Sequence, residues 1–405
     1  MTTAKARAAR QHTISDLRGV SRLAVDAVAG VTGIVEAMHR NITGSAPIVG
    51  RSRTGATSGI TGLVYRGVRG VTNAVGIGLD AALGRLSPLL KDDGVSPRRE
   101  ALLAALNGVF GDYLVASGNP LAIPMGLRQE GRLLVLDRQS LAADIAHPAD
   151  RLLVMVHGLG MNDLQWQREG HNHGASLARD LGYTALYLHY NSGRHVSTNG
   201  REFSTLLEQL VQQWPVPVRE LVIIGHSMGG LVARSACHYA RLARCSWRSR
   251  LKKLVFLGTP HHGAPLERAG NWVDILVGIS PYTAPFARLG MIRSAGIKDL
   301  RYGSILDEDW DDEAGGRARD PLRRVPLPRG VQCFAVAATR ASSSQGSLRR
   351  LPGDGLVPVM SALGWHKDPA RTLAIPESRQ AIFHGSSHFD LLSRHDVYER
   401  IRDWL

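Results

Sequence analysis

The feature that most constrains this chain is the run Gly-His-Ser-Met-Gly-Gly at positions 225–230. The residues before it, 221–224, are continuously apolar, which is typical of a strand buried on both faces of a sheet. A Gly-x-Ser-x-Gly run between a strand and a helix predicts a turn so sharp that it lifts Ser227 out of the sheet, and glycines prevent collisions there. The first N–H groups of the following helix would face a developing oxyanion. We therefore predict that Ser227 is a nucleophile and that the backbone N–H of Met228 is one oxyanion donor.

The remaining parts of a serine-based site follow apolar runs elsewhere in the chain. His-Gly-Leu-Gly at 157–160 is the type of loop that supplies a second oxyanion donor, here the N–H of Leu159. Asp354 and then His388 come after later runs. Ser, then Asp, then His is also the chain order known for sites built on a Gly-x-Ser-x-Gly turn. We predict His388 as the general base and Asp354 as the acid that orients it.

Rival residues exist for the acid and the base. Three carboxylates precede the last strand but lie before the strand at 331, where this arrangement does not normally place its acid, and two further histidines flank the preferred base. These rivals are Asp299, Asp307 and Asp309 for the acid, and His384 and His395 for the base.

The fold class follows from alternating apolar runs and helical patterns, with helices expected near 174–181, 200–214 and 229–243. Such alternation predicts an α/β fold with a mostly parallel sheet flanked by helices, whose motif loops all lie at the carboxyl edge. The strands are expected at 131–136, 151–156, 184–190, 220–225, 251–257, 331–338 and 379–384.

With these motifs in order, the chain resembles the lipase and esterase branch of the α/β-hydrolase superfamily. The run Gly-Thr-Pro-His-His-Gly at 258–263 is similar to a lipase signature, and the bacterial proteins related to the GPI inositol-deacylase (PGAP-type) catalytic domain are the nearest resemblance. The resemblance covers residues 128–405. It implies an α/β-hydrolase fold and a serine carboxylic-ester hydrolase that acts through an acyl-enzyme on Ser227, without a cofactor. An acyltransferase on the same scaffold and a non-catalytic interaction protein stay open as alternatives.

Residues 263–330 exceed a simple connection and are predicted to form a cap inserted over the site. Caps of lipase-like enzymes contact acyl chains and gate access. Packing of the insertion onto the core would explain the same apolar residues equally well. The candidate substrate contacts are Trp272, Ile275, Leu276 and Phe286.

Several polar clusters invite a metal interpretation, but none has convincing spacing. His261 and His262 fit a turn packed beneath the nucleophile, and His171 and His173 fit a solvated loop. The acidic run at 307–313 lacks the spacing of a calcium loop. We therefore predict no metal.

Residues 1–127 differ in character from the rest and are predicted to form a glycine- and alanine-rich, basic helical extension to the catalytic domain at 128–405. Small residues recur once per helical turn in 63–90, which would let another helix approach closely, as in a hairpin or an oligomer contact. Charged residues interrupt every apolar run before it reaches the roughly 18 to 20 residues of a membrane span. A soluble appendage and helices lying on an anionic membrane surface both remain open.

The formal net charge of +14 permits attraction to acidic surfaces, but arginine is spread over the chain without a nucleic-acid motif, so no nucleic-acid partner is expected. The three cysteines offer no disulfide framework, which favours a reducing compartment. We predict a cytoplasmic protein, free or peripheral to the inner face of the membrane, that acts on an acyl ester or lipid.

Overall fold

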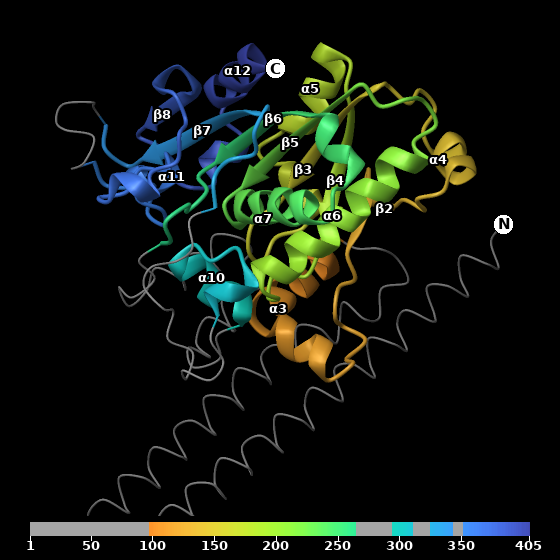
Figure 1. Cartoon of the computed structure of the whole chain (residues 1–405), viewed down its shortest axis with the longest axis horizontal. Helices are drawn as coiled ribbons and strands as arrows, with labels where there is room; N and C mark the ends of the chain where they lie inside the picture. Colours follow the sequence, from red (N-terminus) through yellow and green to blue (C-terminus); the bar gives the residue numbers. More distant parts are fainter. Residues whose placement is uncertain (1–96, 265–293, 311–324, 343–350) are drawn as a thin grey trace, which may run out of the picture.

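The computed structural model describes residues 97–264, 294–310, 325–342 and 351–405. The strands found there form one sheet in the order β2-β1-β4-β3-β5-β6-β7-β8 (Figure 1). Strands β3 to β8 run parallel, whereas β1 is antiparallel to β2 and β4. The predicted α/β fold with a mostly parallel sheet is therefore confirmed. The strands are β1 (Gly126–Gln129), β2 (Arg132–Leu133), β3 (Arg151–Val156), β4 (Thr184–His189), β5 (Glu220–His226), β6 (Leu251–Leu257), β7 (Gln332–Thr339) and β8 (Gln380–His384).

Helices α6 and α7 cover one face of this sheet, and α5 and α12 pack together on the other (Figure 1). The central strands β3 and β5 are almost wholly buried between these layers, as their unbroken apolar runs predict. The α-helices are α3 (Pro97–Ala116), α4 (Arg138–Asp144), α5 (His173–Leu181), α6 (Val196–Gln213), α7 (Met228–Leu242), α10 (Ala295–Tyr302), α11 (Val359–Ala362) and α12 (His395–Trp404). The short 3-10 helices are η1 (Asp163–Trp166), η2 (Ser246–Ser249), η3 (Asp307–Asp309), η6 (Pro369–Arg371), η7 (Glu377–Arg379) and η8 (Asp390–Leu392).

The first strand differs from the prediction of a strand over 131–136. The chain instead turns back at Glu130 and Gly131, which both have positive φ (50° and 76°), and forms the hairpin of β1 and β2. Two successive residues with positive φ are the mark of the tight turn that matches the twist of paired strands. The predicted strand therefore contained β2 but continued past its end at Leu133, and it missed β1, whose sequence Gly-Leu-Arg-Gln has no apolar run.

Helix α3 comes from the segment that the sequence places in the N-terminal extension. Its apolar residues, including Leu102, Leu106 and Leu114, are fully buried in the same core as the sheet. The predicted boundary between residues 127 and 128 falls inside β1. Residues 1–96 lie outside the described part of the chain, and so do the small-residue series on which the expected helical pairing rests.

The cap expected over 263–330 is described in part. Its residues 294–310 contain α10, which begins at the capping residue Ser294 and ends at Gly303 in the left-handed region (φ 74°). Helix α10 packs beside α3 (Figure 1). The candidate substrate contacts Trp272, Ile275, Leu276 and Phe286 lie outside the described residues. Within the described residues, no helix combines the length and apolarity needed to cross a membrane.

His173 links α5 to the last loop before α12. Its Nε2–H donates to the carbonyl of Leu391 (2.9 Å), which leaves Nδ1 to accept from Nε2–H of His171 (2.8 Å). The ring is fully buried and stacks on Tyr398. The interpretation of His173 as part of a solvated loop was wrong, because these bonds hold it inside the protein.

The stability of the fold should therefore fall in acid. Burial lowers the pKa of His173 from 6.5 to about 4, so its contribution is complete above pH 6.5 and is lost as the pH falls towards 4. Between pH 7 and pH 4.5 this one residue should remove about 2 to 3 kcal/mol of unfolding free energy. Urea unfolding of His173→Gln should show a smaller decline over that interval than the unmodified chain. The exposed His147→Gln should keep the full decline, and an equal decline in all three proteins would contradict the assignment.

Candidate active site

Ser227 lies between β5 and α7 in a backbone conformation that non-glycine residues rarely adopt (φ 54°, ψ −123°). Its N–H donates to the carbonyl of Leu257 at the end of the neighbouring strand β6 (2.8 Å), and its carbonyl accepts from the N–H of Gly230 (3.1 Å). These bonds fix a residue whose backbone is strained, which is typical of a functional position. The sharp strand–turn–helix predicted from the sequence is present.

Glycine is required on both sides of this turn because the chain passes too close for a side chain. A Cβ added at Gly229 would lie 2.2 Å from the carbonyl oxygen of Val156, at the end of β3. One added at Gly225 would lie 2.5 Å from the backbone nitrogen of Gly230. A side chain cannot be accommodated at such distances. Both glycines therefore allow α7 to lie this close to the edge of the sheet.

Asp354 and His388 form a buried pair. Nδ1–H of His388 donates to Oδ2 of Asp354 at 2.7 Å, and both residues are nearly inaccessible. The other carboxylate oxygen, Oδ1, accepts the backbone N–H groups of Leu356 (2.9 Å) and Val357 (2.8 Å). With Nδ1 committed as a donor, the neutral imidazole has its basic lone pair on Nε2.

Ser227 and His388 line the same small cavity, about 10 Å³ in volume. The structure therefore brings the predicted nucleophile, base and acid together at the carboxyl edge of the sheet. Among the hydrogen bonds of the described residues, none joins Ser227 to the His388 imidazole. Catalytic hydrogen bonds are often long in a ligand-free site and tighten when substrate binds. The other described residues that line the cavity are Gly158, Leu159, Met161, His226, Ala264, Leu300, Leu356, Val357 and Phe389.

The backbone N–H groups of Leu159 and Met228 have no hydrogen-bond acceptor among the described residues. Gly158 sits directly opposite the nucleophile, because a Cβ added there would be 3.1 Å from Cβ of Ser227. Two unengaged donors on either side of a strained serine fit the predicted oxyanion hole.

Contacts that could not be predicted from the sequence hold residues 157–160, here called the oxyanion loop, in place. The N–H of Gly160 donates to the buried hydroxyl of Ser192 (2.8 Å). Helix α3 also presses on this loop, since a Cβ added at Gly108 would lie 2.8 Å from Cα of Gly160. Below the loop, the ring of His157 stacks on Tyr190 (4.3 Å between centroids), whose hydroxyl donates to the carbonyl of His157. Burial lowers the pKa of His157 to about 3, so this ring is neutral.

The Ser192 hydroxyl holds the backbone of Gly160, so its removal should let the neighbouring N–H of Leu159 move out of position. We expect Ser192→Ala to lower kcat for an ester about tenfold and to leave KM nearly unchanged, because a displaced oxyanion donor acts in the transition state. The measurement is steady-state hydrolysis. Ser235→Ala is the matched control, since its buried hydroxyl also donates to a backbone carbonyl, that of Ile305 (2.7 Å). Equal losses in both variants would mean that Ser192 acts through stability alone.

His226, within the Gly-His-Ser run, is a site residue to which the sequence assigned no role. Its ring lies 4.7 Å from that of His388, and its Nε2–H donates to the backbone carbonyl of His388 (3.3 Å). Burial, followed by the neighbouring His388, holds the pKa of His226 well below its usual value. The neutral ring thus supports the base without competing for its proton.

The rival residues are engaged elsewhere. Asp299 accepts from the N–H of Val196 (2.6 Å) and pairs with His195, and desolvation raises the pKa of Asp299 to about 6. Asp307 pairs with Arg201, and Asp309 accepts from the N–H groups of Ile305 and Leu306. His384 ends β8, and the exposed His395 begins α12 beside Glu399.

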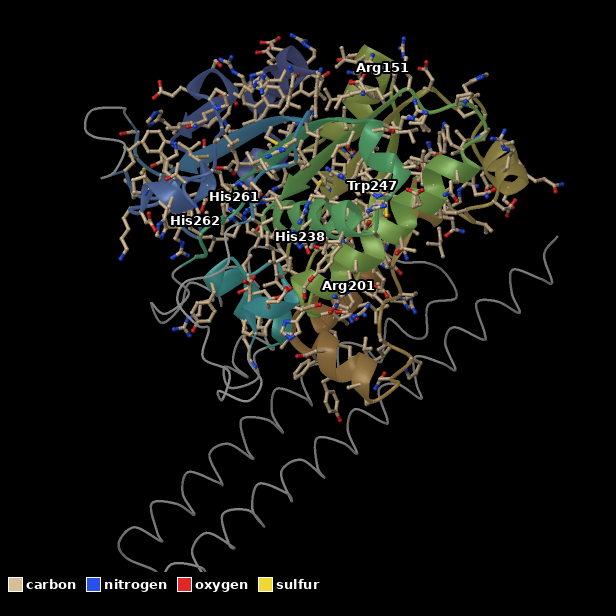
Figure 2. All side chains as sticks on the ribbon, viewed as in Figure 1. Arg151, Arg201, His238, Trp247, His261 and His262 are labelled. Atoms are coloured by element: carbon tan, nitrogen blue, oxygen red, sulfur yellow. The ribbon has the colours of Figure 1, made fainter. Side chains whose placement is uncertain are left out.

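His261 and His262 follow β6 and lie next to one another (Figure 2). His261 is buried against Arg234, and His262 donates to the carbonyl of Gly364 (3.0 Å). Burial lowers the pKa of His262 to about 4. The described residues contain no group of three or more His, Cys, Asp or Glu side chains that could hold a metal ion.

The sheet order and the serine turn define the class of the protein as an α/β hydrolase. Within it, residues 148–314 match the family model of the PGAP1-like alpha/beta domain, so the predicted resemblance is confirmed. This match includes Ser227 and the predicted oxyanion donors Leu159 and Met228, whereas Asp354 and His388 lie beyond it.

Other comparisons place solved lipases and esterases beside this chain. It is similar to the mature lipase BlEst2 of Bacillus licheniformis, with 19% identity over 64% of this chain and 95% of that chain (TM-score 0.40). It is also similar to a thermophilic esterase of Thermogutta terrifontis, with 14% identity over 70% of this chain and 93% of that chain (TM-score 0.36). An esterase of Pyrococcus furiosus shows 14% identity over 63% and 81% of the two chains (TM-score 0.37). No curated protein sequence matches the chain.

Proposed function

We propose that this chain is a serine carboxylic-ester hydrolase that acts through an acyl-enzyme on Ser227. The observation that carries the proposal is the buried hydrogen bond between His388 and Asp354, in a cavity that the strained Ser227 also lines. A base oriented by a buried carboxylate beside a serine on a sharp turn is the arrangement of acyl-transfer chemistry.

In the proposed reaction, Nε2 of His388 takes the proton of Ser227 as its oxygen attacks the ester carbonyl. Asp354 holds the imidazole in the tautomer that leaves Nε2 basic and stabilises the imidazolium that forms. The N–H groups of Leu159 and Met228 stabilise the oxyanion of the tetrahedral intermediate. The proton on His388 then passes to the leaving alcohol, and water repeats the sequence to release the acid.

The substrate class rests on the surroundings of the nucleophile. Apolar side chains such as Met161, Leu300 and Phe389 line the cavity, which suits the acyl part of an ester better than a charged group.

The cysteines bear on the proposed location of the protein. The structure pairs none of Cys237, Cys245 and Cys333 in a disulfide, which supports a reducing compartment such as the cytoplasm.

Hydrolysis of p-nitrophenyl esters with acyl chains from two to sixteen carbons tests the proposal. We expect turnover by the purified chain, with an optimum chain length that distinguishes a small-ester site from a lipase groove. Detection of an acyl-enzyme on Ser227 by mass spectrometry of rapidly quenched reactions would support the covalent route. The proposal would be refuted if no such adduct formed during turnover and the rate were unchanged in Ser227→Ala.

A further inference from the structure

A second cavity, distant from Ser227, opens beside the carboxyl-terminal half of α7. Its volume is about 430 Å³, within the range of roughly 300 to 1,000 Å³ that small-molecule sites occupy. Cys237, which lines it, is ten residues along α7 from Ser227, about 15 Å at the rise of a helix. His238, also in the lining, marks its place on the molecule (Figure 2). This cavity is therefore separate from the catalytic one.

The surface of this cavity is mostly apolar. The buried thiol of Cys237 stays protonated because burial raises its pKa. Val325 is fixed by a hydrogen bond from Nη2 of the buried Arg234 to its carbonyl (3.0 Å), so this wall is held in place by the core. The apolar segment of the lining is Val325, Pro326, Leu327 and Pro328.

Three arginines from different parts of the chain contribute to this apolar lining: Arg241 on α7, Arg248 on η2 and Arg329 in the turn before β7. In the described part of the chain, none of the three has an ion-pair partner, and no Asp or Glu lines the cavity. Three cations without carboxylates, gathered around an apolar hollow, complement a molecule with an anionic head and a hydrocarbon tail.

We propose that this cavity is a second ligand site that binds an acyl-chain carboxylate, with the head at the three arginines and the chain against the segment 325–328. The carboxylate would be held by charge-assisted hydrogen bonds from the guanidinium groups, and the hydrocarbon would be removed from water by the apolar wall. Binding here requires no hydrolysis, so it stands apart from the function proposed for Ser227.

Isothermal titration of the full-length Ser227→Ala protein with dodecanoate, below its micelle concentration, tests the site without turnover. We expect saturable binding that weakens at least tenfold in the triple variant R241Q/R248Q/R329Q. The matched control is R98Q/R132Q/R400Q, which removes the same charge from exposed arginines elsewhere and should bind as the parent does. Hydrogen–deuterium exchange of the parent should show protection of residues 237–242 when dodecanoate is added.

Comparison ligands separate the chemistry of the head from that of the chain. Dodecanol, which lacks the charge, and inorganic phosphate, which lacks the chain, should each bind at least tenfold more weakly than dodecanoate. If dodecanol bound as tightly as dodecanoate, the cavity would be an unspecific apolar surface. If phosphate bound as tightly, it would be a simple anion site. Either result, or dodecanoate binding that the three arginine substitutions leave unchanged, overturns the proposal, as does a failure of dodecanoate to bind.

Discussion

Replacing Ser227 by alanine should reduce ester hydrolysis by about 10⁴-fold or more, because the acyl-enzyme cannot form without the hydroxyl. The substitution removes one oxygen from a residue whose backbone is fixed by hydrogen bonds to Leu257 and Gly230, so the fold should persist. The measurement is initial-rate hydrolysis of the best p-nitrophenyl ester, together with the thermal unfolding midpoint of each protein.

The control for this variant is Ser249→Ala, which removes an exposed serine hydroxyl that donates to the carbonyl of Ser246 (2.8 Å). It should retain full activity. A fluorophosphonate probe should label the unmodified chain and Ser249→Ala but not Ser227→Ala. Hydrolysis that survives in Ser227→Ala, at a rate close to that of the unmodified chain, would assign the nucleophile to another residue.

Replacing Asp354 by asparagine should lower kcat by roughly 10³- to 10⁴-fold with little change in the position of the backbone. The amide oxygen can still accept from the N–H groups of Leu356 and Val357, so the local turn is retained. The amide nitrogen, however, cannot accept the proton of His388 Nδ1. The imidazole then favours the tautomer with the proton on Nε2, which cannot act as a base towards Ser227.

The rival acid offers a stringent control for this experiment. Asp299 is as buried as Asp354, but its partners are His195 and the N–H of Val196. Asp299→Asn should therefore change the unfolding free energy more than kcat. The reverse pattern, with activity lost in Asp299→Asn and kept in Asp354→Asn, would transfer the role of the acid and refute the pairing with His388.

The sequence was most informative where a local pattern and the chain order point to the same result. Buried parallel strands have continuous apolar runs, so β3, β5 and β6 lie where those runs predict them. The turn around Ser227 needs glycine on both sides for steric reasons, and that need is visible in the sequence. Ser227, Asp354 and His388 follow β5, β7 and β8, and parallel strands end at the same edge of a sheet, so residues far apart in the chain could be predicted to lie in one place.

What the sequence could not predict depends on contacts between distant segments. Ser192 and Tyr190 are ordinary residues until the fold places them against the oxyanion loop, and no local signal marks such a partner. The role of His226 was hidden for the same reason, since its ring matters only through its position beside His388. Helix α3 was placed in the N-terminal extension because the composition changes before residue 128, and composition alone does not show that this helix packs into the core of the sheet.

The position of α3 limits how the gene could be shortened for study or engineering. A truncated protein that begins at residue 128 would lack the helix that buries Leu102, Leu106 and Leu114, and would leave their apolar partners open to water. It would also lack the backbone of Gly108 that rests against Gly160. Such a fragment should aggregate or lose activity even though every residue assigned to the reaction is present, so a shortened protein has to keep α3 from Pro97 onwards.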